Sequence, residues 1–100
     1  MAKSLPPVHP GEVLKIEFMA PLELSANRLA RVLRVPANRI SAIVNGERGV
    51  SADTALRLAK AFGTTPDFWL NLQRRYDLDC ARDMATDLAR IEPIRARANS

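Results

Sequence analysis

The sequence has a single cysteine, Cys80, and a single histidine, His9, so few of its side chains suit redox or metal chemistry. One cysteine cannot form a disulfide within the chain, and this favours a reducing compartment. Two separated ligands of this kind do not make a zinc site, and His9 fits better as the cap of a helix. No glycine-rich phosphate loop and no paired catalytic carboxylates are evident. We therefore predict no cofactor and no metal, and an enzyme is the function class that the sequence supports least.

Long hydrophobic runs are also missing. No apolar stretch approaches the ~18 residues of a membrane-spanning helix, and the first residues lack the apolar segment of a secretory signal. The hydrophobic content of 47% is ordinary for a folded chain, and 100 residues leave room for one core. We therefore expect a cytoplasmic protein of one domain over residues 9–92, with a flexible arm over 1–8 and a frayed tail over 93–100.

Acidic residues are scarce in the middle of the chain and abundant near its end. Residues 25–50 carry five arginines against one glutamate, whereas residues 77–92 carry five acidic residues against two arginines. Each run could simply be a solvated face. Alternatively, the middle of the chain contacts a polyanion and the later segment contacts something basic.

Proline, glycine and capping residues divide the chain into helical segments with no convincing strand, so the predicted fold class is all-α. The first helix is expected to begin at Pro10 and to reach about Met19, because Pro21 stops it. Ser25 is placed to cap a second helix, which Pro36 ends.

Capping residues, proline and glycine also mark the ends of the later helices. A third short helix is expected over 37–44, where Asn45-Gly46 closes it, and a fourth runs from the cap Ser51 to Gly63. A fifth begins at Thr65-Pro66. Its aromatic residues lie at helical spacing, so we predict that they belong to the core and do not stack on bases. They are Phe68, Trp69 and Tyr76.

A sixth helix is expected from about Leu78 to Ile91, with apolar residues along one side. This apolar side either folds back on its own domain or packs against a second copy of the chain, and we favour the second copy because five helices already enclose one small core. The residues predicted to form the dimer contact are Met84, Leu88 and Ile91.

The second and third helices are separated by only about three residues, which forces a steep crossing as in a helix-turn-helix. The small side chain of Ala30 permits close contact at such a crossing. If Ile40, Ile43 and Val44 face the interior, a short polar stripe faces outward, with Arg39 on its flank. The outward residues follow the spacing i, i+3, i+4, i+7 and are Asn38, Ser41, Ala42 and Asn45.

This stripe has the chemistry of a helix that reads the major groove of DNA. Asparagine can bond bidentately to adenine, serine can donate or accept, and an alanine methyl can contact a thymine methyl. We therefore predict base-reading roles for the four outward residues and for Arg39. The alternative is an ordinary helical hairpin whose polar side faces water.

The basic residues around the stripe are suited to phosphate contacts that set the position of the helix. The amino end of the second helix, capped by Ser25, also offers backbone N–H groups to a phosphate. The predicted phosphate-contacting residues are Ser25, Asn27, Arg28, Arg34 and Arg48.

Three stretches also carry a family resemblance: "HPGEVL" at 9–14, "LARVLRVPANRISAIVNGERGVSADTALRLAKAFGTTPDFWLNLQ" at 29–73 and "YDL" at 76–78. With them the sequence resembles the lambda-repressor-like (XRE) helix-turn-helix family, and specifically the HigA antitoxins of type II toxin–antitoxin modules. The resemblance covers about residues 8–92. It implies a five-helix DNA-binding domain to which this chain adds a C-terminal helix, with the segment from Pro36 to Asn45 as the recognition helix.

The resemblance further implies a homodimer that binds double-stranded DNA at a palindromic operator, usually in its own promoter. It also implies a partner, a small basic ribonuclease toxin of the HigB/RelE-like class. Two residues depart from the family pattern, since Arg34 and Glu23 stand where glycine is common. Arg34 must either accept a strained positive φ or leave that region of backbone conformation.

Three functions remain open from the sequence. The first is an antitoxin that represses its own operon and neutralises a toxin through another surface, with the acidic C-terminal segment and the N-terminal arm as candidates. The second is a stand-alone dimeric repressor without a toxin partner. The third is a helical scaffold that binds only protein, with arginines that are merely solvated.

Overall fold

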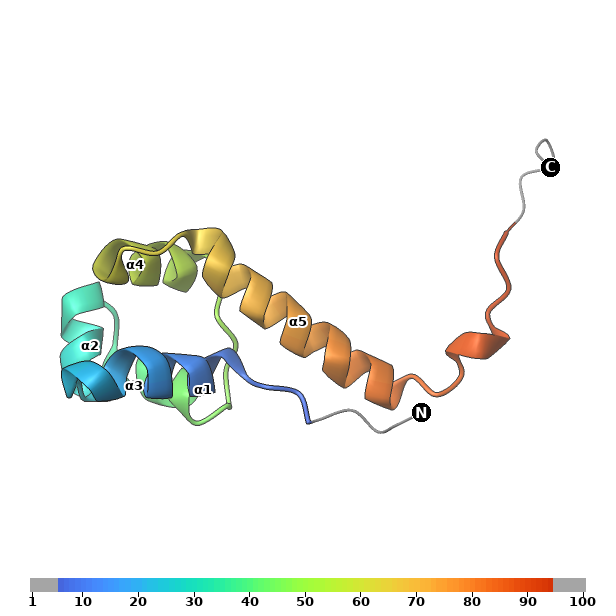
Figure 1. Ribbon diagram of the computed structural model, residues 1–100, viewed down its shortest axis with the longest axis horizontal. Helices are drawn as coiled ribbons and strands as arrows, with labels where there is room; N and C mark the ends of the chain where they lie inside the picture. Colours follow the sequence, from blue (N-terminus) through green and yellow to red (C-terminus); the bar gives the residue numbers. More distant parts are fainter. Residues whose placement is uncertain (1–5, 95–100) are drawn as a thin grey trace.

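The computed structural model describes residues 6–94 of the chain, and this part contains five α-helices and no β-strand. They are α1 (Pro10–Val13), α2 (Ala26–Leu33), α3 (Ala37–Val44), α4 (Ala52–Phe62) and α5 (Pro66–Met84). Helices α1 to α4 gather at one end of the molecule, and α5 projects from them (Figure 1). The predicted all-α helix-turn-helix fold is confirmed. Residues 1–5 of the predicted arm and 95–100 of the predicted tail lie outside the described residues.

The first helical segment is longer than predicted. After α1 it continues as a π-helical segment, η1 (Leu14–Met19), and a 3-10 turn, η2 (Ala20–Leu22), so Pro21 lies inside the segment. The backbone N–H of Ala20 donates to the carbonyl of Lys15, five residues earlier. This wider turn places two residues five positions apart, Leu14 and Met19, in the core, which α-helical spacing would not do.

Side-chain caps begin the helices where the sequence places them. His9 Nδ1 accepts the backbone N–H of Gly11 at 2.9 Å, and Ser25 Oγ accepts that of Arg28 at 3.0 Å. Ser51 and Thr65 cap α4 and α5 in the same way. These bonds satisfy N–H groups that have no partner inside a helix.

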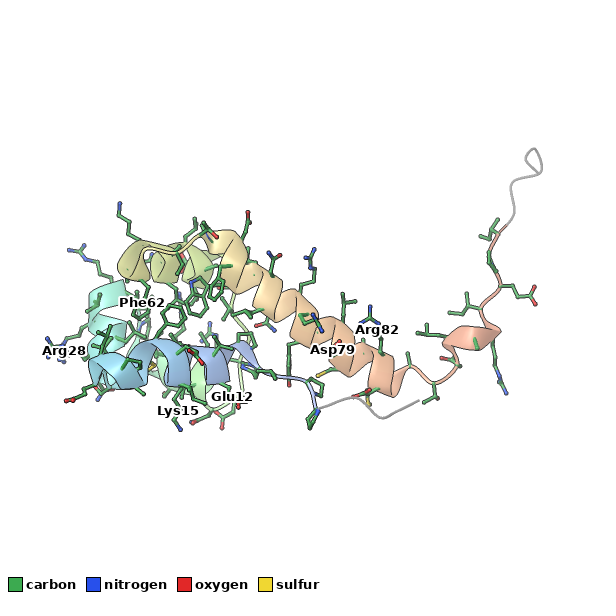
Figure 2. The ribbon with its side chains drawn as sticks, viewed as in Figure 1. Glu12, Lys15, Arg28, Phe62, Asp79 and Arg82 are labelled. Atoms are coloured by element: carbon green, nitrogen blue, oxygen red, sulfur yellow. The ribbon has the colours of Figure 1, made fainter. Side chains whose placement is uncertain are left out.

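The core lies between helices α1 to α4 and the first turns of α5. Trp69 is fully buried, and its Nε1 donates to Thr64 Oγ1 at 2.8 Å. Phe18 packs 5.1 Å from Phe62 and 4.9 Å from Trp69 between ring centroids, and Figure 2 shows Phe62 directed from α4 into this cluster. The buried apolar residues are Leu14, Met19, Leu29, Ala30, Leu33, Ile40, Ile43, Val50, Ala55, Leu58, Ala59 and Trp69.

The prediction for the C-terminal part was wrong in two respects. There is no helix boundary near Leu78, because α5 continues to Met84, and only a 3-10 turn, η3 (Leu88–Arg90), follows it. Side-chain pairs lie along α5 at this point: Gln73 Nε2 donates to Asp77 at 2.9 Å just before Leu78, and Arg75 pairs with Asp79 across it at 3.3 Å. These pairs at helical spacing favour one continuous helix.

Two of the three predicted core aromatics lie at the margin of the core. Trp69 is buried as predicted, but Phe68 is 36% exposed, and Tyr76 is half-buried. Tyr76 contacts the ring of His9 edge-on at 4.8 Å between centroids, so it covers the start of α1. For Tyr76 the reason is geometric, since α5 leaves the helical cluster after its first turns and its later residues have fewer neighbours (Figure 1). Phe68 lies in the first turn of α5, where its ring contacts those of Phe18 and Trp69.

Candidate nucleic-acid interface

Helices α2 and α3 form the predicted helix-turn-helix. Ala30 is 2% exposed, and its carbonyl accepts the N–H of Val35 in the turn at 3.0 Å. Arg34, at the end of α2, has φ 63° and ψ 45° and so keeps the left-handed conformation in which glycine is favoured. The first of the two alternatives for Arg34 therefore holds. Glu23 has φ 53°, so both departures from the family's glycines lie at strained backbone positions.

The orientation of α3 is the one that the sequence predicts. Ile40 and Ile43 are buried, and Val44 is half-buried against the core. On the opposite side, Asn38 and Asn45 are exposed. Between them Ser41 and Ala42 are half-buried, and Ser41 Oγ lies 3.3 Å from the carbonyl of Ala37. The stripe therefore presents two free amides at its ends and two small side chains at its centre.

Arg39, predicted to read bases, is held within the protein. Its Nη1 donates to Asp53 Oδ2 on α4 at 2.7 Å, and its side chain is 23% exposed. The same Asp53 oxygen accepts Arg57 Nε at 3.0 Å, and Arg57 Nη1 donates to the carbonyl of Leu33 at 2.9 Å. These bonds join α3, α4 and the end of α2. The hydrogen bonds from Arg39 and then Arg57 lower the pKa of Asp53, so its carboxylate is ionised at neutral pH.

Sequence reasoning missed Asp53 and Arg57. Their spacing of four residues on a helix indicates a mutual ion pair, and that signal was available. The contact with Arg39 spans fourteen residues and two helices, so no local pattern indicates it.

The predicted phosphate-contacting residues are all exposed, and they lie around the two helices. Ser25, Asn27 and Arg28 occupy the start of α2, Arg34 lies in the turn, and Arg48 lies in the loop between α3 and α4. Figure 2 shows Arg28 extending away from the body of the molecule. The positions of these cations and of the Ser25 cap are compatible with contacts to a DNA backbone that flanks the stripe.

The carboxyl end of α3 and the loop that follows it are held by residues that the sequence did not single out for this role. A Cβ added to Gly11 on α1 would lie 1.8 Å from the carbonyl oxygen of Ile43, so only glycine fits there. Gln73 Oε1 on α5 accepts the N–H of Val50 at 2.7 Å, and its side chain fills the space beside Gly49. The first contact therefore holds the end of α3, and the second holds the end of the loop that carries Arg48.

The three residues predicted to form a dimer contact lie beyond the core. Met84 is 81% exposed, Leu88 52% and Ile91 66%. They do not fold back on their own domain, which was the alternative. Among residues 6–94, no helix combines the length and the apolar character that a membrane span requires.

Comparison with known proteins assigns the family. Residues 16–69 match the family described as helix-turn-helix. The antitoxin HigA-1 of Vibrio cholerae is 40% identical over 90 residues, which cover 88% of this chain and 84% of that protein. An uncharacterised HTH-type transcriptional regulator of Escherichia coli, YbaQ, is 45% identical over 91 residues, covering 88% and 80%.

Solved structures agree with the sequence comparison. Antitoxin HigA of Pseudomonas aeruginosa, solved with the higBA promoter, superposes with a TM-score of 0.85 at 42% identity, covering 89% of this chain and 99% of that one. The chain therefore belongs to the HigA family of helix-turn-helix antitoxins. Antitoxins and regulators of this family are not a class of enzymes.

Proposed function

We propose that this protein is a sequence-specific DNA-binding antitoxin, which represses its own toxin–antitoxin operon as a dimer and neutralises a RelE-like ribonuclease toxin by direct binding. The observation that carries the DNA-binding part is the orientation of α3. Its isoleucines are buried, so its asparagines face outward between exposed arginines. Because operator DNA is the target, we place the protein in the cytoplasm.

The relatives support this proposal. The Pseudomonas aeruginosa structure contains HigA with the higBA promoter, so a protein of the same fold and 42% identity binds promoter DNA. In this chain the predicted base-reading residues are Asn38, Arg39, Ser41, Ala42 and Asn45. The predicted phosphate-contacting residues are Ser25, Asn27, Arg28, Arg34 and Arg48.

A dimer is proposed because a palindromic operator presents two identical half-sites, which a two-fold symmetric protein matches. The exposed apolar residues after the core supply a surface for it. Met84, Leu88 and Ile91 are more than half exposed, and burial of such side chains against a second copy removes apolar area from water.

Operator binding is tested by a gel-shift titration of the purified chain on its own upstream region and on a scrambled duplex of equal length. We expect preference for the upstream region and an affinity that falls steeply between 50 and 200 mM salt, which are concentrations at which phosphate contacts are lost. Equal, salt-insensitive binding to both duplexes would contradict the proposal.

The phosphate contacts are tested with charge-removing variants. Arg28→Ala and Arg48→Ala should weaken binding to both duplexes by the same factor and reduce the salt slope by about 1 each. Arg74→Ala is the matched control, because Arg74 is exposed on α5 and bonds Asn71 at 3.1 Å. Its slope should remain that of the native chain.

The toxin partner is tested by co-expression with the small basic protein encoded beside this gene, if such a reading frame exists. A stable complex of the two proteins, together with growth of cells that the neighbouring protein alone would arrest, supports the antitoxin function. Operator binding without a complex between the two proteins would favour the second candidate, a stand-alone repressor. This candidate is also supported by the 45% identity to YbaQ, which is named as a transcriptional regulator and not as an antitoxin.

A further inference from the structure

The recognition helix carries one arginine whose charge is already neutralised within the protein. Arg39 bonds Asp53 at 2.7 Å, and its Nε is buried without a hydrogen-bond partner among residues 6–94. A partly buried guanidinium is favourable only when a carboxylate compensates the lost hydration. Asp53 is that carboxylate, so removal of its charge should release Arg39 toward solvent.

A released Arg39 would face DNA on a long flexible stem. From the flank of the stripe it could reach phosphates, and phosphate contacts form with every sequence. Such contacts raise the affinity for all DNA and carry no information about bases. The present geometry prevents them, because Arg39 is tied to the first turn of α4 and Arg57 ties the same carboxylate to the end of α2.

From this geometry we infer that Asp53 is a specificity-determining positioning residue: it holds Arg39 beside the reading stripe and away from phosphates, and so lowers binding to non-operator DNA. The inference rests on the proposed DNA-binding function. Asp53 acts through Arg39 and contacts no base. Its own side chain is 53% exposed at the edge of the interface, so an unpaired Asp53 would repel the DNA backbone.

The experiment measures the dissociation constants of the full chain on operator and scrambled duplexes at several salt concentrations. For Asp53→Asn we expect about three- to tenfold tighter binding to scrambled DNA, a salt slope steeper by about 1, and a lower ratio of operator to scrambled affinity. Asp53→Glu keeps the charge and should keep the native slope. Asp53→Ser is a second neutral variant, and circular dichroism verifies that each chain is folded.

Two controls separate this role from a general effect of charge or of folding. Asp83→Asn removes the same charge from α5, outside the helix-turn-helix, and should leave the slope on scrambled DNA unchanged. The double variant with Arg39→Ala and Asp53→Asn should lose the extra binding, because the effect of Asp53 passes through Arg39.

Three results would overturn the inference. They are an unchanged affinity ratio in Asp53→Asn, an equal gain in Asp83→Asn, and a gain that survives when Arg39 is absent. The slope on scrambled DNA needs no operator, so it tests the restraint on Arg39 even if the native chain shows no sequence preference. If the native chain binds operator and scrambled DNA equally well, that result contradicts the proposed function and not the restraint on Arg39.

Discussion

The helix-turn-helix and the C-terminal stretch of this chain distribute their apolar residues in opposite ways. Within α2 and α3 the residues with less than 5% exposure are apolar, and the outward residues are mainly asparagines and arginines, with one large apolar side chain, Val32, at 57% exposure. From Leu78 to Ile94 the large apolar side chains are exposed, from 44% for Leu78 to 81% for Met84 and 99% for Ile94. The first region buries its apolar residues in the core, whereas the second leaves its apolar side chains exposed.

The shape of the chain reflects the same difference. Its Cα radius of gyration is 17.7 Å, compared with about 13 Å for a compact domain of this length. Among the described residues, α5 and residues 85–94 extend away from the helical cluster, which makes the molecule elongated (Figure 1). One end of the molecule therefore contains the core, and the other leaves exposed the apolar side chains that we propose as the dimer contact.

The largest expected effect tests the self-contained region. Gly11→Ala places a Cβ against the carbonyl of Ile43, where no room exists, so α1 must separate from α3. The free energy of unfolding should fall by about 3 kcal/mol or more in urea titrations. Glu12→Ala, one residue later and exposed, is the control and should change it little. A loss below about 1 kcal/mol for Gly11→Ala would show that the contact is not tight.

The next effect tests the predicted dimer contact in the C-terminal stretch. Met84→Ser combined with Leu88→Ser should weaken self-association by about 2 kcal/mol, or roughly 30-fold, because less apolar area is buried between copies. Sedimentation equilibrium measures the dissociation constant. The free energy of unfolding of the helix-turn-helix region should stay within about 0.5 kcal/mol of that of the native chain. If association is unchanged, the exposed residues are not the dimer contact.

A smaller effect separates backbone strain from DNA contact within the first region. Arg34→Gly should raise the free energy of unfolding by about 0.5–1 kcal/mol, because glycine adopts φ 63° without strain. It should also weaken binding to every DNA sequence. Glu23→Gly relieves the same kind of strain at φ 53° and is the matched control, with a similar gain in stability and unchanged DNA binding. Loss of DNA binding in both variants would assign the effect to the backbone.

The smallest effect concerns the junction of the two regions, where His9 meets Tyr76. Burial lowers the pKa of His9, although the nearby charge of Asp77 opposes this. As the pH falls, His9 is therefore protonated at a higher pH in the unfolded chain than in the folded chain. The free energy of unfolding should fall as the pH drops below about 6.5. Urea titrations at pH 7.5 and 5.5 measure this change. His9→Asn can still cap the helix but cannot titrate, and a native pH dependence in that variant would exclude His9 as its source.

The parts of the fold that the sequence predicts are those with local causes. Ser25, Ser51 and Thr65 start helices because their hydroxyls bond N–H groups three residues later. The orientation of α3 is predictable because Ile40 and Ile43 set its buried side. The break near Leu78 was wrong, because apolar residues at helical spacing up to Ile91 were interpreted as a separate helix. The Arg75–Asp79 pair lies within one helix that continues through this point.

The parts that the sequence does not predict depend on distant contacts. The Arg39–Asp53 ion pair joins two helices, and nothing in the local pattern of α3 indicates it. The space that only Gly11 can occupy is created by the carbonyl of Ile43 on another helix. The candidate site could therefore be located from the sequence, but the state of its central arginine required the three-dimensional arrangement.

The most direct measurement is a set of affinities for operator duplexes that differ by one base pair each, determined for the native chain and for Asn38→Ala. Asn71→Ala, exposed on α5, is the control. We predict that replacing one particular A·T pair of the operator weakens binding of the native chain by about 1–3 kcal/mol. The same replacement should not change the affinity of Asn38→Ala. If Asn38→Ala discriminates among all the duplexes as the native chain does, the outward stripe of α3 does not read bases.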